Sequence, residues 1–124
     1  MDLRAYSANP DGVMAYLEYM NLFSGKKVII MPCLIELGKS SKEIHKEIGK
    51  KIAQVNGLAI ITTRDRFNEI KTGATGVGMK GDSIVSMENP KKIKNLLKDY
   101  VSNSDTVLLA GRLPQGIIDA IKKN

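Results

Sequence analysis

The chain has 124 residues, which suits one ordinary domain and leaves no room for a second catalytic domain. Apolar residues make up 43% and charged residues 26%, so a packed core is expected and wholesale disorder is excluded. No apolar run reaches the roughly 20 residues that cross a bilayer, and the first residues lack the basic and then apolar order of a signal peptide. These features predict a single cytoplasmic domain over residues 1–124, with no membrane partner.

The formal net charge of +6 raises the question of nucleic-acid binding. The lysines are spread in pairs among acidic residues, they form no block of five or more, and only two Phe and four Tyr are present. We therefore expect solvated helix faces and no nucleic-acid partner, with a mild attraction for phosphorylated or carboxylated small molecules. The single cysteine has no second cysteine with which to form an internal disulfide. One cysteine and one histidine are also too few for a typical zinc site, so no metal ligands are predicted.

Short apolar runs predict the strands. Three of the four clear runs are nearly continuous, which is typical of strands that are covered on both faces of a parallel sheet. These runs are Val28–Met31, Leu58–Thr62, Ser83–Ser86 and Thr106–Ala110, and a weaker first strand is expected at Asp2–Tyr6.

Helical patterns lie between these strands. Asn9-Pro10 is typical of a helix start, with Asn as the cap and Pro at the first helical position, and this helix should end near Phe23. Ser40-Ser41-Lys42-Glu43 matches a capping box and predicts a second helix that Gly57 stops. Asn89-Pro90 predicts the start of a third helix, and Pro114 that of a fourth.

The segment 63–82 shows no convincing period, so we predict it to be irregular, with one or two helical turns at most around Phe67 and Ile70. The alternation of the other elements predicts an α/β fold with a Rossmann-like, open and mostly parallel sheet and helices on both faces.

Three patterns suggest chemistry that the context does not support. Residues 76–81 match G-x-G-x-x-G, but they precede an apolar run where a dinucleotide motif should open a helix, so a turn is the better interpretation. Gly25-Lys26-Lys27 lacks the Ser or Thr of a phosphate-binding P-loop. Cys33 and His45 could form a nucleophile and its base, but their places in apolar patterns favour a packed cysteine and a structural histidine.

Polar residues gather where the predicted strands end. In open α/β sheets ligands bind beyond the carboxyl ends of the strands. Asn9 follows the first strand, Glu36 and Lys39 the second, Arg64 the third and Arg112 the last. A plainer alternative is that Asn9 and Thr63 cap helices and that Arg64, Asp65 and Arg112 are only solvated.

Three of these segments resemble the C-terminal domain of Mur ligases, in particular of the type that adds D-alanyl-D-alanine. They are Tyr6-Ser7-Ala8-Asn9-Pro10-Asp11, then Leu34-Ile35-Glu36-Leu37-Gly38 followed by His45 and Gly49, and Val107-Leu108-Leu109-Ala110-Gly111-Arg112. The three segments occur in the same order as in the family, and together they span nearly the whole chain.

The resemblance implies a division of labour. In such ligases an N-terminal domain binds a UDP substrate, a central domain carries the ATP P-loop, and the C-terminal domain binds the incoming amino acid or dipeptide and closes over the nucleotide. It implies that this chain is an excised or separately encoded domain of an ATP-dependent, amide-bond-forming ligase of peptidoglycan precursor synthesis, inactive alone. ATP and Mg2+ would be cofactors of the complete enzyme, held mostly elsewhere.

The resemblance also suggests roles for the residues at the strand ends. Contacts with the nucleotide and closure are expected of Asp2, Arg4, Tyr6 and Asn9. Binding of the amine substrate is expected of Glu36, Lys39, Arg64 and Arg112, since the planar guanidinium of Arg112 suits a carboxylate. The alternative to a ligase domain is a stand-alone, non-catalytic module that binds a nucleotide or a small anion.

Overall fold

A computed structural model describes residues 2–6, 9–55 and 57–122, and these form one five-stranded sheet in the order β1-β5-β2-β3-β4. Every neighbouring pair of strands is parallel. The strands are β1 (Asp2–Tyr6), β2 (Lys27–Met31), β3 (Gly57–Ile61), β4 (Ile84–Ser86) and β5 (Thr106–Ala110). The helices are α1 (Pro10–Met20), α2 (Ser41–Gln54), α3 (Phe67–Gly76), α4 (Pro90–Tyr100) and α5 (Gln115–Lys122), with short 3-10 turns at Gly38–Ser40 and Gly81–Ser83.

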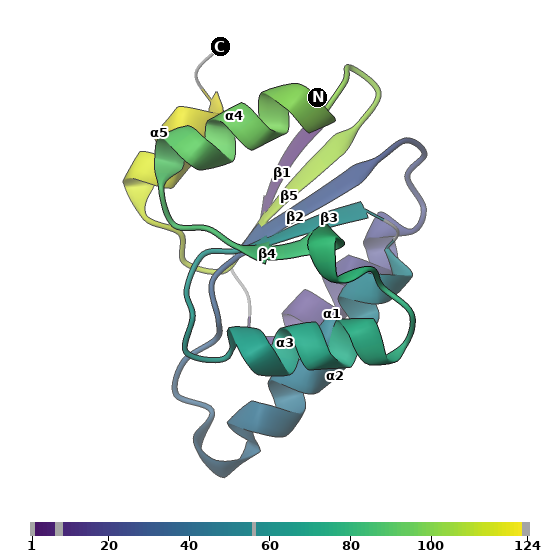
Figure 1. Ribbon diagram of the computed structural model, residues 1–124, viewed down its shortest axis with the longest axis vertical. Coiled ribbons are helices and arrows are strands. Elements are labelled where there is room, and N and C mark those ends of the chain that lie inside the picture. Colours follow the sequence, from purple (N-terminus) through teal and green to yellow (C-terminus); the bar gives the residue numbers. More distant parts are fainter. Residues whose placement is uncertain (1, 7–8, 56, 123–124) are drawn as a thin grey trace.

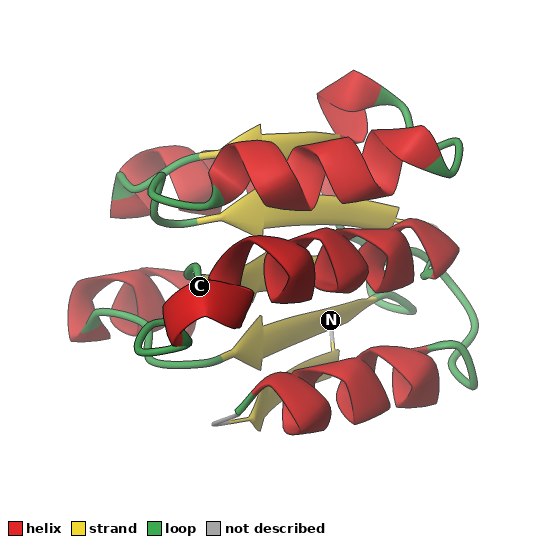
Figure 2. Ribbon diagram, turned by 90° about the horizontal axis from the view of Figure 1, so that it is seen from below, coloured by secondary structure: helices red, strands yellow, loops and turns green. Residues whose placement is uncertain are grey.

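The sheet is the middle layer of three. Helices α1, α2 and α3 cover one face, and α4 and α5 cover the other (Figures 1 and 2). Side chains along a strand alternate between the faces, so on β2 Ile29 and Met31 pack with the first group of helices and Val28 and Ile30 with the second. All four are buried, which explains the continuous apolar run, and the predicted fold class is confirmed.

The order of the strands determines where the segments that follow two neighbouring strands leave the sheet toward opposite faces. The chain moves in one direction across the sheet from β1 through β2 and β3 to β4, and then returns to place β5 between β1 and β2. Right-handed crossovers in opposite directions require helices on opposite faces, as observed for α1 to α3 and for α4. The segments that follow β5 and β2 therefore leave the sheet toward different faces, and this leaves a crevice at the carboxyl edge.

The prediction of an irregular segment over 63–82 is wrong, because it contains the ten-residue helix α3. Its buried face is made of Ile70, Gly73 and Ala74, and small residues contribute little to an apolar period. Gly73 lies so close to α2 that a Cβ there would be 2.1 Å from the Lys46 carbonyl oxygen, and a Cβ on Gly49 of α2 would be 2.0 Å from that of Ile70. Close packing on α2 thus supports a helix that propensity alone disfavours.

The helix starts were predicted with mixed success. The Asn9 side chain accepts the Gly12 N–H at 2.8 Å, and Asn89 caps α4 in the same way, so both Asn-Pro caps are confirmed. The capping box at Ser40 is wrong. Ser40 belongs to a 3-10 turn with helical φ and ψ, and its side chain makes no capping hydrogen bond. An extended residue is needed at that position to turn the hydroxyl back toward the helix.

In the ranges that the structure describes, no helix has both the length and the apolar character that crossing a bilayer requires.

Candidate functional site

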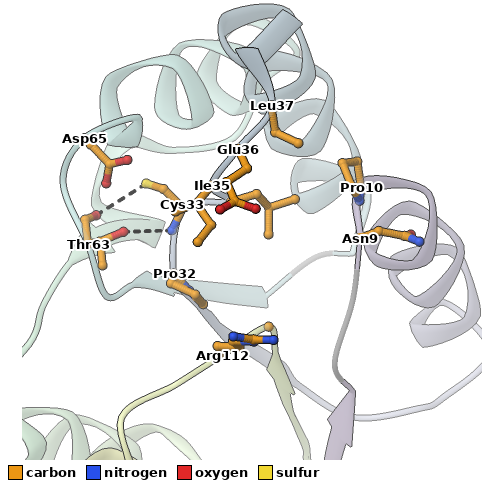
Figure 3. A pocket seen from close by; sticks show the side chains of 12 residues that line it. Asn9, Pro10, Pro32, Cys33, Ile35, Glu36, Leu37, Thr63, Asp65 and Arg112 are labelled. Atoms are coloured by element: carbon orange, nitrogen blue, oxygen red, sulfur yellow. Dashed lines mark hydrogen bonds between the residues drawn. The ribbon is translucent and has the colours of Figure 1, made fainter.

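A pocket of about 640 Å³ opens at the carboxyl edge of the sheet, in the crevice between the diverging connections (Figure 3). Segments that follow four of the strands contribute to it, as expected for a ligand site in an open α/β sheet. The lining residues are Asn9 and Pro10 after β1, Pro32 to Leu37 after β2, Thr63 and Asp65 after β3, and Gly111 and Arg112 after β5.

The segment after β2, residues 32–37, forms the largest share of the wall and is here named the pocket segment. It begins with the buried Pro32 and Cys33 and then turns outward, so that Ile35 is 68% exposed. Glu36 has a φ of 61°, in the left-handed region of backbone conformation that residues other than Gly and Asn rarely adopt. Such a conformation costs on the order of 1–3 kcal/mol and persists only where the surroundings impose it.

The base of the pocket segment is fixed by side chains from other elements. The Cys33 amide donates to Thr63 Oγ1 at 2.8 Å, and the Leu34 amide donates to His45 Nε2 at 2.9 Å. His45 is fully buried on α2, and its Nδ1 lies 2.6 Å from the Ser41 carbonyl oxygen. Both ring nitrogens are therefore engaged, and the interpretation of His45 as a packed structural histidine is confirmed.

Cys33 is not placed as a nucleophile. Its thiol donates weakly to the Thr63 carbonyl at 3.6 Å and accepts from the Arg66 amide at 3.4 Å. Burial raises the pKa of the Cys33 thiol, so the reactive thiolate is disfavoured. Since His45 directs both nitrogens elsewhere, no cysteine–histidine pair is formed.

The charges in the pocket are mixed. Glu36 lies on the pocket segment and Arg112 on the opposite wall after β5, with Asp65 farther along beside Thr63 (Figure 3). Apolar side chains of Pro10, Ile35 and Leu37 also line the pocket. A guanidinium facing a carboxylate across a small, partly apolar space can hold the two ends of a zwitterion, the carboxylate at the cation and the ammonium at the anion.

Of the eight residues predicted for the site, the structure brings three together at this pocket: Asn9, Glu36 and Arg112. Asn9 has a dual position, since it lines the pocket and also caps α1. Lys39, in the 3-10 turn before α2, and Arg64, after β3, are exposed and are not among the lining residues.

The remaining predicted residues belong to β1. Asp2 and Arg4 pair with each other at 2.9 Å, and the Arg4 guanidinium lies 4.4 Å from the centre of the Phe23 ring, outside the pocket lining. Tyr6 ends β1 opposite Ala110, and its side chain lies outside the described part of the structure.

Sequence reasoning missed the residues that support the site. Arg66, at the start of α3, donates to Ser41 Oγ at 3.1 Å and pairs with Glu69 at 3.0 Å, which ties α3 to the first turn of α2. Its place depends on α3, which the apolar pattern did not predict. Thr63 Oγ1 supports the pocket segment and caps no helix, a role that no local pattern indicates.

The glycine-rich match at residues 76–81 lies away from this pocket. It spans the end of α3 and the turn before β4, with Gly78 at a φ of 107°. No α-helix begins there, only the short 3-10 turn Gly81–Ser83, so its interpretation as a turn is confirmed. Among the described residues, no group of three or more His, Cys, Asp or Glu side chains could hold a metal ion.

Two solved structures resemble this fold. One is the crystal structure of MurF ligase from Thermotoga maritima in complex with ADP, with a TM-score of 0.72 and 24% identity over 94% of this chain. The other is MurF from Acinetobacter baumannii, with a TM-score of 0.74 and 20% identity over 96% of this chain. The chain spans about a quarter of the length of each, 26% and 27%. At these identities the two structures establish the fold alone.

The family follows from the sequence. The family model described as "Mur ligase, glutamate ligase domain" matches residues 3–113. The match includes the five strands almost completely and all four pocket walls, from Asn9 to Arg112. With the Rossmann-like sheet and the pocket at its carboxyl edge, this match means that the chain belongs to the Mur ligase family, as a glutamate ligase domain.

Proposed function

We propose that this chain is the amine-binding domain of an ATP-dependent, amide-bond-forming ligase of peptidoglycan precursor synthesis, and that it is inactive without the other domains. The observation that carries the proposal is the pocket at the carboxyl edge, which Arg112 and Glu36 line from opposite sides (Figure 3), in a chain of the Mur ligase family. Its incoming substrate would be an amino acid or a dipeptide, with D-alanyl-D-alanine as the first candidate because both similar structures are MurF ligases.

The chemistry of the pocket supports this assignment. A free amino acid or dipeptide carries one carboxylate and one ammonium, which match Arg112 and Glu36. Charge-assisted hydrogen bonds from a guanidinium fork fix both oxygens of a carboxylate, and this would orient the amine at the other end of the molecule. The apolar walls would exclude water from the bound substrate.

The pocket does not fit a nucleoside triphosphate. Two carboxylates, Glu36 and Asp65, line it together with a single guanidinium, and this balance repels a highly charged anion. We therefore assign ATP and Mg2+ to a central P-loop domain of the complete enzyme, and the UDP-linked substrate to an N-terminal domain. The ADP in the Thermotoga maritima structure supports the use of ATP, and the proposal includes a cytoplasmic location for the complete enzyme, where ATP is available.

Residues outside the substrate-facing walls keep separate proposed roles. Asn9, at the edge of the pocket, is the candidate for contact with the nucleotide held by the central domain, together with Tyr6 and the Asp2–Arg4 pair of β1. Lys39 and Arg64 stay candidates for substrate contacts made on closure of the domains.

The proposal is tested by titrating the isotope-labelled chain with D-alanyl-D-alanine and following its amide resonances. We expect the resonances of the pocket segment and of Gly111 and Arg112 to shift. Arg112→Gln should weaken binding at least about tenfold, since a charge-assisted hydrogen bond contributes about 1.5–3 kcal/mol.

Lys98→Gln is the matched control, because it removes one exposed cation from α4, which lies on the sheet face opposite α1 to α3. Binding that is equally strong in the Arg112→Gln and Lys98→Gln variants would contradict the proposed site.

A further inference from the structure

Two consecutive amides at the base of the pocket segment are held by side chains that come from different elements. Thr63, after β3, accepts the Cys33 N–H, and His45, on α2, accepts the Leu34 N–H. Beyond these fixed points the segment turns outward through the exposed Ile35 and the left-handed Glu36. The place of the Glu36 carboxylate in the pocket therefore depends on these two hydrogen bonds.

The partners of His45 define its protonation. Nδ1 lies 2.6 Å from the Ser41 carbonyl oxygen, which can only accept, so Nδ1 carries a proton. Nε2 lies 2.9 Å from the Leu34 amide, which can only donate, so Nε2 carries a lone pair. A second proton, on Nε2, would set two N–H groups against each other and break the hydrogen bond to Leu34.

We infer that His45 is the positioning residue of the pocket: its unprotonated Nε2 holds the Leu34 amide, and this hydrogen bond sets the place of Glu36. The expected effect of His45 on binding of the amine substrate rests on the proposed function. The expected effect of His45 on the hydrogen bond of the Leu34 amide does not.

The charged groups around His45 are those of three elements. Arg66, the residue before α3, reaches the same turn because its Nε donates to Ser41 Oγ, and Ser41 Oγ is 3.4 Å from His45 Nδ1. Glu69 pairs with this guanidinium. The pocket segment contributes the Cys33 thiol and Glu36, and α2 itself carries Lys42, Glu43 and Lys46 on the neighbouring turns. Glu69 pairs with Arg66 at 3.0 Å and Glu43 with Lys46 at 3.9 Å, and the acceptor of the Leu34 N–H is His45 Nε2.

A matched pair of variants separates positioning from packing. A Gln side chain places its oxygen near the position of Nε2, whereas an Asn side chain reaches only as far as Nδ1. His45→Gln therefore keeps an acceptor for Leu34, and His45→Asn loses it at similar polarity. Both variants replace a buried ring by a smaller amide, so a mere packing role predicts similar losses in both.

Hydrogen exchange of the Leu34 amide in the intact chain is the first measurement. His45→Asn should lower the protection factor about tenfold to a hundredfold, and His45→Gln should restore most of it. Equal protection of Leu34 in the two variants overturns the role of Nε2.

Binding of D-alanyl-D-alanine, followed by amide resonances, is the second measurement. We expect affinity to fall about tenfold in His45→Asn and less than about twofold in His45→Gln. Unchanged affinity in a His45→Asn chain that has lost protection at Leu34 overturns the positioning of the pocket. Absence of binding in the wild type contradicts the proposed function, and the exchange measurements then decide the role of Nε2 by themselves.

Discussion

Asp105 is a buried carboxylate that joins three parts of the chain. Its Oδ1 accepts the Lys26 N–H at 2.8 Å, and its Oδ2 accepts the N–H and the hydroxyl of Ser102. The backbone N–H groups of Ser102 and Lys26 lower the pKa of Asp105, because they stabilise the charged carboxylate. The residue thus holds the loop before β2 against the start of β5.

The lowered pKa of Asp105 makes folding stability depend on pH with a definite sign. A carboxyl with a lower pKa in the folded state contributes stability above its unfolded pKa of about 3.9, and loses it as pH falls through the folded value. Asp105→Asn should therefore lower Tm clearly at pH 7, since the new amide N–H meets the donors of Ser102. The difference from wild type should shrink below about pH 4, as thermal denaturation at several pH values would measure.

Asp99→Asn, on the exposed side of α4, is the control for Asp105→Asn and should leave Tm nearly unchanged at both ends of the pH range. A Tm difference for Asp105→Asn that persists unchanged at low pH would mean that lost packing, rather than the lost charge, destabilises the variant.

Residue-scale reasoning from sequence identified two charged residues on opposite sides of the pocket and missed the residues that support the pocket. Glu36 and Arg112 lie in the segments that follow β2 and β5, so the predicted strand ends indicate their place at the carboxyl edge. Thr63 and Arg66 matter through hydrogen bonds to residues about 25 to 33 positions away, and no local pattern records such partners.

At the scale of elements, α2 and α3 form the closest helix pair of the fold. The contact depends on Gly49 and Gly73, each of which faces a backbone carbonyl of the other helix at a distance where a Cβ does not fit. Gly76, at the end of α3, has open space around it. The same substitution at two positions of one helix therefore tests the contact directly.

Gly73→Ala should destabilise the chain by about 3 kcal/mol or more, because the methyl group forces the two backbones apart. Gly76→Ala should be neutral or should stabilise by up to about 1 kcal/mol, as helix propensity favours Ala over Gly. Urea denaturation at 25 °C measures both. A small loss for Gly73→Ala would mean that the helices can separate at little cost.

The packing of α2 and α3 also explains why α3 was not predicted. Apolar periodicity detects helices that bury large side chains, such as α4 with Ile93 and Leu97. A helix that packs through Gly73 and Ala74 leaves a polar-looking sequence, and its stability comes from a neighbour 20 to 30 residues earlier in the chain. The Asn-Pro starts were predictable because a cap involves only the adjacent turn.

At the scale of the whole molecule, the continuous apolar runs predicted the three-layer architecture correctly. A strand such as β5, buried along its whole length, requires helices on both faces, and the two core clusters supply them. The insertion of β5 between β1 and β2 was not predictable from periodicity, because strand order depends on pairing between distant segments. Yet this insertion separates the connections and opens the pocket.

The backbone of Glu36 also has a consequence for engineering of this domain. A residue forced into the left-handed region lowers the stability of the fold, and Asn at position 36 would relieve part of that strain while removing the carboxylate that faces Arg112. Selection for heat resistance alone should therefore favour substitutions at this position, and the resulting proteins should melt at higher temperature and bind amines less well. In this domain, thermal stability and ligand binding would therefore favour different residues at position 36.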